Sequence, residues 1–128
     1  MKILVADRDM SLGRLYQEEL EEMGHKVIFM YSGEKLAETI ARRKPDVLIL
    51  GSRLPDIAAV DYSSVELLAR LKANFPELKV IYNSSIVEFR AAAKQAGADY
   101  CITKSSDLTD MRDAVQEIAQ QKDNKPVR

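Results

Sequence analysis

The sequence predicts an α/β protein in which a parallel sheet is covered by helices on both faces. Short apolar runs alternate strictly with segments whose apolar residues recur every three or four positions, and this unit occurs five times in 128 residues. The runs are continuous and do not alternate apolar with polar residues, which is typical of strands buried on both faces. Strict alternation of strands and helices favours parallel pairing with right-handed crossovers.

The strands are expected at five apolar runs, namely residues 2–6, 25–30, 47–50, 78–82 and 98–102. Each run is followed by apolar positions at helical spacing, namely Leu12, Tyr16, Leu20 and Met23; Leu36, Ile40 and Ala41; Leu67, Leu68 and Leu71; Phe89, Ala92, Ala93 and Ala96; Leu108, Met111, Val115 and Ile118. These spacings predict five helices, each with one apolar face directed toward the sheet.

Capping signals mark where these helices begin and end. Polar residues that favour helix N-caps precede each periodic segment, namely Asp9, Ser32, Ser63, Ser85 and Asp107. Ser63 and Ser85 are each followed three residues later by glutamate, which has the form of a capping box. Residues that end helices follow the first four segments, namely Gly24, Pro45, Pro76 and Gly97.

The run at residues 47–50 is the predicted centre of the sheet. Asp46 precedes this run, and Gly51 follows it. Open α/β sheets place their sites just beyond the carboxyl ends of such strands. The residue at this position is therefore a glycine, which offers no side chain for chemistry.

Composition limits the classes of function. Nineteen lysines and arginines balance 20 aspartates and glutamates, which gives no broad electrostatic reason to bind nucleic acid or an anionic membrane. The apolar runs are too short to span a bilayer. Met1 leads directly into a strand-like run with no signal-peptide pattern, and Cys101 is the only cysteine, so a cytoplasmic location is expected.

Four segments in register resemble one known family. They are MKILVADRD, KPDVLILGSRLPD, KVIYNSS and AAAKQAGADYCITK. The sequence resembles the receiver domain of bacterial response regulators in two-component systems, the CheY-like members of the flavodoxin-like fold, from Lys2 to about Gln121. The resemblance implies a (βα)5 three-layer sandwich with strand order 2-1-3-4-5. Residues 1–121 are then the receiver-like domain, and residues 122–128 are a polar tail or the start of a linker.

The resemblance also assigns the positions of the family's phosphorylation pocket. The nucleophilic aspartate falls on Gly51, so no aspartyl phosphate is expected there. The first acidic position is retained as Asp7, whereas the second falls on Arg8. The hydroxyl and lysine positions fall on Ser84 and Lys104, which match the family.

The charge of this pocket argues against a metal ion. A working site carries about two net negative charges before Mg²⁺ binds. Here Asp7 faces Arg8 and Lys104, a net of about plus one, which repels a divalent cation. We therefore expect no metal, no cofactor and no catalytic residue, and we expect Arg8, together with Lys104, to pair with Asp7. An equally acceptable interpretation is that Asp7 and Arg8 form an ordinary exposed ion pair.

The family's switch aromatic falls on Cys101. In relatives, phosphorylation pulls the hydroxyl residue and lets this aromatic turn inward, which changes the face formed by the fourth helix, fifth strand and fifth helix. Tyr100 is adjacent but is expected on the other side of the strand. The switch is therefore expected to be absent.

These losses predict a pseudo-receiver, a non-enzymatic module that binds a protein partner without phosphorylation. By family analogy its candidate face has five exposed charged residues, Glu88, Arg90, Lys94, Arg112 and Glu117. A homodimer is compatible with the same face. Two alternatives stay open: a regulator that accepts phosphate on Asp56 or Asp61, and a sensor domain that holds a small anion near Arg8, Lys104 and the amides of the two serines at 84 and 85.

Overall fold

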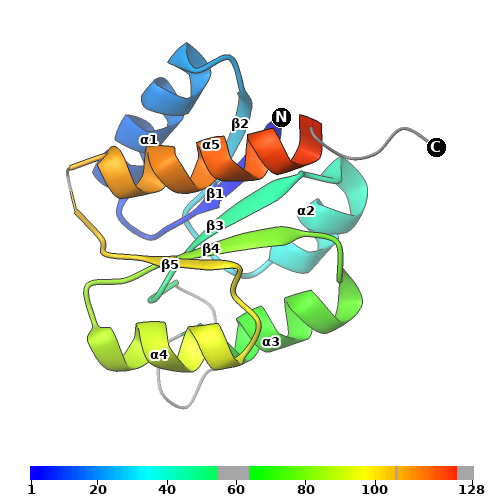
Figure 1. Cartoon of the computed structure of the whole chain (residues 1–128). Coiled ribbons are helices and arrows are strands. Elements are labelled where there is room, and N and C mark those ends of the chain that lie inside the picture. The colour runs from blue at the N-terminus through cyan, green and yellow to red at the C-terminus, as the bar shows by residue number, and fades with distance from the viewer. Residues whose placement is uncertain (55–63, 106, 124–128) are drawn as a thin grey trace.

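The computed structural model describes residues 1–54, 64–105 and 107–123, and five strands and five helices alternate along these described residues (Figure 1). The strands are β1 (Lys2–Ala6), β2 (Lys26–Met30), β3 (Val47–Gly51), β4 (Lys79–Asn83) and β5 (Tyr100–Ile102). The helices are α1 (Met10–Glu22), α2 (Leu36–Arg43), α3 (Val65–Asn74), α4 (Val87–Gln95) and α5 (Thr109–Asp123). The predicted α/β class is confirmed.

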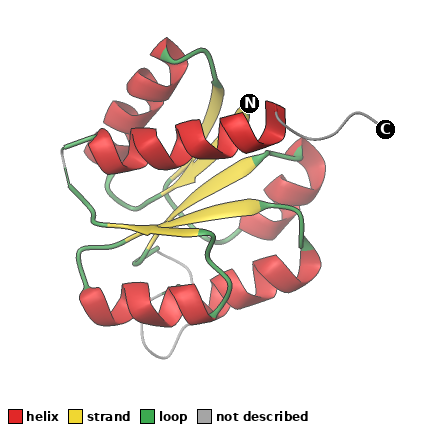
Figure 2. Ribbon diagram, in the orientation of Figure 1, coloured by secondary structure: helices red, strands yellow, loops and turns green. Residues whose placement is uncertain are grey.

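The strands form one parallel sheet in the order β2-β1-β3-β4-β5, as predicted (Figure 2). β3 lies at the centre, where Leu48 is in register with Leu4 of β1 and Val80 of β4. Because all the strands run the same way, their carboxyl ends meet along one edge of the sheet. That edge collects the residues that follow β1, β3, β4 and β5.

Two hydrophobic cores lie on opposite faces of the sheet. Ile3 and Val5 of β1 pack with α1 and α5, whereas Leu4 and Ala6 pack with α2, α3 and α4. Figure 1 shows α1 and α5 above the sheet and α3 and α4 below it. Because side chains alternate between the faces, both sets of residues in a central strand must be apolar. This arrangement explains the continuous apolar run at β3, all five residues of which are buried.

The cap predicted for α1 is confirmed, whereas the predicted cap Asp107 lies two residues before the first residue of α5. The Asp9 carboxylate accepts a hydrogen bond from Leu12 N at 3.0 Å, and Gly24 follows α1 with a left-handed φ of 94°. The Asp107 carboxylate accepts one from Thr109 N at 3.0 Å. α5 continues to Asp123, so the first two residues of the expected tail are helical.

Two predicted caps are wrong. The N-cap of α2 is Lys35, not Ser32, and the Lys35 side chain makes no cap hydrogen bond. The N-cap of α4 is Ile86, whose backbone N–H donates to the hydroxyl of Ser84, whereas Ser85 is exposed. The buried serine is thus the one used, because the chain leaving β4 is still inside the fold at that point.

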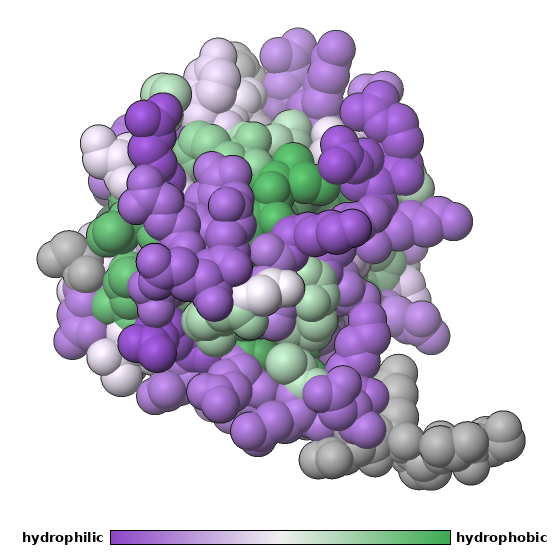
Figure 3. Space-filling model, turned by 90° about the horizontal axis from the view of Figure 1, so that it is seen from above, coloured by the Kyte–Doolittle hydropathy of each residue, from purple (hydrophilic) through white to green (hydrophobic). Residues whose placement is uncertain are grey.

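The surface over α1 and α5 is mostly hydrophilic, with hydrophobic residues in smaller patches between the polar ones (Figure 3). Among the described residues, no helix is both long and apolar enough to cross a membrane.

Asp99 joins three elements next to β5. Its Oδ2 accepts hydrogen bonds from Val80 N at 2.8 Å and from Lys72 Nζ at 3.1 Å, which links β4 and α3 to the start of β5. By contrast, Glu66 pairs with Arg70 across one turn of α3, and both side chains are more than half exposed.

We expect Asp99→Ala to lower the free energy of unfolding by about 1–3 kcal/mol, because it leaves the N–H of Val80 without its acceptor and removes the ion-pair partner of Lys72. The exposed pair is worth roughly 0.5 kcal/mol or less, so Glu66→Ala serves as the control. Urea unfolding of both variants measures the difference. Equal losses would contradict this role for Asp99.

Candidate functional site: a pocket closed by an ion pair

Asp7 is the centre of the polar cluster at the carboxyl edge of the sheet. It follows β1 directly, and only 3% of its surface is exposed. Its Oδ1 accepts a hydrogen bond from Asp9 N at 2.9 Å and forms an ion pair with Lys104 Nζ at 2.8 Å. A buried carboxylate is costly unless it is paired and hydrogen-bonded, and here both conditions are met.

Lys104 reaches Asp7 because the segment after β5 remains attached to β4. Ser84 N donates to Ile102 O at 3.2 Å, and Lys104 N donates to Ser84 O at 3.3 Å. The Lys104 side chain is 24% exposed, so the pair is shielded from water mainly on the Asp7 side. The ion pair thus connects residues 97 positions apart in the chain.

Gly51 lies directly against this carboxylate. A Cβ atom added at Gly51 would lie 2.7 Å from Asp7 Oδ2 and 2.9 Å from Asp7 Cγ, closer than real Cβ atoms approach other atoms. The Asp7 carboxylate therefore occupies the space into which a side chain at position 51 would extend. The glycine is required here by close approach and not by a positive φ.

Two serines complete the buried part of the pocket through internal bonds. The hydroxyl of Ser64, a residue that sequence reasoning did not place in the pocket, donates to Gly51 O at 2.8 Å and is fully buried. Ser64 is the N-cap of α3 but makes no side-chain cap bond; Ser63, the predicted cap, lies outside the described residues. Ser84 is also fully buried, and its hydroxyl accepts a hydrogen bond from Ile86 N at 3.0 Å.

Arg8 does not join this cluster. Its side chain is exposed, and within the described part of the chain the ion pair to Asp7 is made by Lys104 alone. The expected pairing of Arg8 with Asp7 is therefore wrong. In an extended segment consecutive side chains point to opposite sides, so an inward Asp7 directs Arg8 outward.

Cys101 and Tyr100 face opposite sides of β5, as predicted. Cys101 packs with the core beneath α2, α3 and α4, and its Sγ donates to Arg90 O at 3.4 Å. Tyr100 packs with the core beneath α1 and α5. Burial raises the pKa of the Cys101 thiol, which keeps it in the unreactive protonated form.

The donor set of this pocket does not fit Mg²⁺. This cation requires several oxygen ligands, usually with one or two free carboxylates. Asp7 is already neutralised by Lys104, and neither Gly51 nor Arg8 supplies a carboxylate. No cluster of three potential ligands among histidine, cysteine, aspartate and glutamate occurs in the described residues.

The family model for the response regulator receiver domain matches residues 3–116. The chain belongs to this family.

Curated relatives of this receiver domain are longer proteins. It is 30% identical over 103 residues to the alkaline phosphatase synthesis transcriptional regulatory protein PhoP of Bacillus subtilis, covering 80% of this chain and 42% of that protein. It is 27% identical over 105 residues to the response regulator protein VraR of Staphylococcus aureus, covering 80% and 46%. The chain thus spans less than half the length of these relatives.

Solved structures agree with the fold over nearly all of this receiver domain. A two-component response regulator from Clostridium difficile has a TM-score of 0.83 at 22% identity, covering 98% of this chain and 99% of that one. The beryllofluoride-activated receiver domain of RstA from Klebsiella pneumoniae has a TM-score of 0.83 at 21% identity, covering 94% and 100%. At these identities the likeness establishes the fold alone.

A second buried polar pair lies on the α1 side of this edge. Asn83, which pairs in register with Gly51, donates through Nδ2 to the hydroxyl of Tyr16 at 3.0 Å. Both residues are buried, and Asn83 Oδ1 has no hydrogen-bond partner among the described residues. Burial, opposed only in part by the Asn83 hydrogen bond and reinforced by the negative charge of Asp7, raises the pKa of Tyr16 to about 12. Sequence reasoning missed this pair, although one polar residue at the end of an apolar strand is a usable signal.

We expect Gly51→Ala to destabilise the fold by about 1–3 kcal/mol, because the added methyl group overlaps the Asp7 carboxylate. In an Asp7→Ala background the same substitution should cost much less, since the carboxylate is gone. Urea unfolding of the four proteins in this double-mutant cycle measures the coupling. Additive costs would show that Asp7 does not fill the space at position 51.

We expect Tyr16→Phe to flatten the alkaline stability profile. In the unfolded chain Tyr16 ionises near pH 10, but in the folded chain only near pH 12. The unfolded state therefore loses its proton first, and about 2–3 kcal/mol of stability present below pH 10 disappears as the pH rises through 12. Denaturant unfolding between about pH 9 and 12 tests this. Tyr31→Phe is the control, because Tyr31 is 58% exposed; a Tyr16→Phe profile parallel to wild type would refute the shift.

Proposed function

We propose that this receiver domain is a pseudo-receiver, a module that binds a protein partner in signal transduction without being phosphorylated at its own pocket. One observation carries the proposal: the carboxylate of Asp7 fills the space of the missing nucleophile, 2.7 Å from where the Cβ atom at position 51 would lie. Asp7 is then neutralised by Lys104. The pocket is closed by the chain's own groups.

The chemistry of phosphoryl transfer supports the same proposal. An acyl phosphate requires a carboxylate nucleophile, and the transfer requires cationic groups free to stabilise the incoming phosphoryl oxygens. Gly51 supplies no nucleophile, and the ammonium of Lys104 is engaged by Asp7. Ser84 accepts a hydrogen bond from its own chain and is fully buried.

The proposed partner surface is the face formed by α4, β5 and α5. Glu88, Lys94 and Glu117 are exposed on it, and the apolar Val87 at the start of α4 is 62% exposed. A hollow of about 320 Å³ lies between β5 and α5 and is lined in part by Tyr100 and Glu117. Protein interfaces combine an apolar core with a polar rim, and this surface offers both kinds of group.

Arg90 and Arg112 have internal partners on this face. Arg90 Nη1 donates to Ser84 O at 2.7 Å, and Arg112 Nε pairs with Glu19 of α1 at 3.1 Å. Substituting either residue therefore changes the fold as well as the surface. Glu88 and Lys94 are better positions at which to test partner binding.

A second copy of the chain is one candidate partner. One similar solved structure, a beryllofluoride-activated NtrC4 receiver domain, is a dimer; its TM-score is 0.81 at 20% identity, covering 94% of this chain and 97% of that one. Sedimentation of the wild type and of a Glu88→Lys/Lys94→Glu variant would show whether this face mediates self-association.

We expect acetyl phosphate with Mg²⁺ to leave the intact mass of this protein unchanged, because its pocket has no nucleophile and does not collect the metal ion. A receiver domain that carries the phosphoacceptor aspartate is the positive control. A mass increase of one phosphoryl group, mapped by peptide analysis to Asp56 or Asp61, would instead support the alternative acceptor. Both residues lie outside the described part of the chain.

A further inference from the structure

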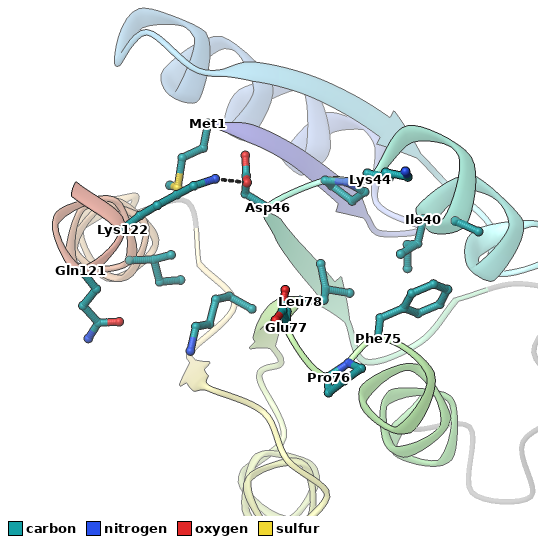
Figure 4. Close-up of a pocket in the computed structure, with 14 residues that line it drawn as sticks. Met1, Ile40, Lys44, Asp46, Phe75, Pro76, Glu77, Leu78, Gln121 and Lys122 are labelled. Atoms are coloured by element: carbon teal, nitrogen blue, oxygen red, sulfur yellow. Dashed lines mark hydrogen bonds and ion pairs between the residues drawn. The ribbon is translucent and has the colours of Figure 1, made fainter. Parts of the chain in front are cut away.

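A cavity of about 860 Å³ lies at the amino-terminal end of the sheet, opposite to the edge that carries Asp7 and Gly51. It is bounded by the ends of α2, α3 and α5 and by the segments that lead into β3 and β4 (Figure 4). Small-molecule sites in proteins have volumes of about 300–1,000 Å³. The proposed function makes no use of this cavity.

The inner surface of the cavity is mainly apolar. Ile40 comes from α2, Phe75 and Leu78 from the connection between α3 and β4, and Ile118 from α5. Figure 4 shows Ile40, Phe75 and Leu78 around one space. Such a surface favours a ligand whose body is apolar, because binding removes both apolar surfaces from water.

One ion pair at the cavity is already satisfied. Asp46 Oδ2 accepts a hydrogen bond from Lys2 N at 2.8 Å, and Asp46 Oδ1 pairs with Lys122 Nζ (Figure 4). Burial tends to raise the pKa of Asp46, but these contacts outweigh it and lower the pKa. The carboxylate therefore stays charged and remains paired with Lys122. Neither Asp46 nor Lys122 is left to recognise a charged ligand.

The remaining charges around the cavity favour an anion. Lys44 makes no ion pair with another residue in the described ranges, and Lys79 lies 3.8 Å from Asp99 with its side chain 46% exposed, a contact of small energetic value. Glu77 is the opposing carboxylate. Two available ammonium groups against one carboxylate leave a net positive charge at the rim.

We propose that this cavity binds a small monocarboxylate with an apolar body, aliphatic or aromatic. The apolar body rests on Ile40, Phe75 and Leu78, and the carboxylate lies at the rim, where Lys44 and Lys79 leave a net positive charge. The inference rests on the cavity and its charges and is independent of the proposed function.

A ligand in this cavity contacts the last turns of α5. Ile118, Gln121 and Lys122 line it, and the Lys122–Asp46 pair joins the end of α5 to the start of β3. Occupancy therefore acts on α5, which also contributes Glu117 to the proposed partner face. Ligand binding in this cavity thus acts as a regulatory input to the partner face. The cavity lies at the opposite end of the sheet from the Asp7 pocket, which has no nucleophile.

The test uses octanoate and 3-phenylpropionate as probes, with octylamine as the cationic counterpart, in thermal unfolding and calorimetric titration of the full chain. The two carboxylates should raise the melting temperature in a saturable way and should shift the amide resonances of Ile40, Leu78 and Ile118. Octylamine should do neither.

Three variants and one control locate the site. Ala41 is exposed and lines the cavity, so Ala41→Trp should fill it and abolish binding. Lys44 has a φ of 49°, which asparagine tolerates, so Lys44→Asn should remove the charge without strain and weaken binding roughly fivefold. Glu77→Gln should tighten it by removing repulsion. Lys94→Asn, on α4 away from the cavity, should leave it unchanged.

Three results would overturn the inference: neither carboxylate binding, binding that persists in Ala41→Trp, or opposite signs for Lys44→Asn and Glu77→Gln, which would indicate a cationic ligand. Each is separate from the acetyl phosphate experiment, whose outcome depends on the other end of the sheet.

Discussion

The ion pair between Asp7 and Lys104 is the interaction on which the carboxyl edge of the sheet depends. Asp7 is held inside the fold by the end of β1, and a carboxylate at such a place must be compensated. Lys104 supplies the compensation from the segment after β5 and joins the first strand to the last unit of the chain. Because Gly51 has no side chain, it leaves space for the Asp7 carboxylate. The three residues are therefore interdependent: Asp7 requires both the charge of Lys104 and the space at Gly51.

The rest of the fold does not rely on this edge. Its stability comes from the two cores on either face of the sheet, which contain no member of the polar cluster. Several carboxylates crowded at one edge of a sheet repel one another and need a cation from solution. One carboxylate paired with one ammonium group is neutral by itself. The carboxyl edge of this domain is thus neutral by itself, while the architecture of the family is intact.

Much of this structure follows from patterns in the sequence, and what does not follow has a physical reason. The strands and the cap at Asp9 follow from local spacing, whereas the strand order was implied by the family resemblance. The bonds made by Ser64 and Ser84 depend on which hydroxyl lies inside when two chain segments meet. The family resemblance placed Lys104 in the same pocket as Asp7, where the two residues form an ion pair, but it could not show that Arg8 faces away.

The sequence indicates the site at the carboxyl end of the sheet, but it does not indicate the cavity at the amino end. At the carboxyl edge, the residues that follow the parallel strands lie close together, so short motifs at the strand ends indicate the site. At the amino end, the cavity is made by helix ends and turns whose residues, such as Ile40 and Phe75, serve the core as well. An apolar residue at these positions can pack in the core or contact a ligand, so its presence in the sequence does not distinguish the two roles. Only the available charges of Lys44 and Lys79 at its rim distinguish a site from a gap between helices.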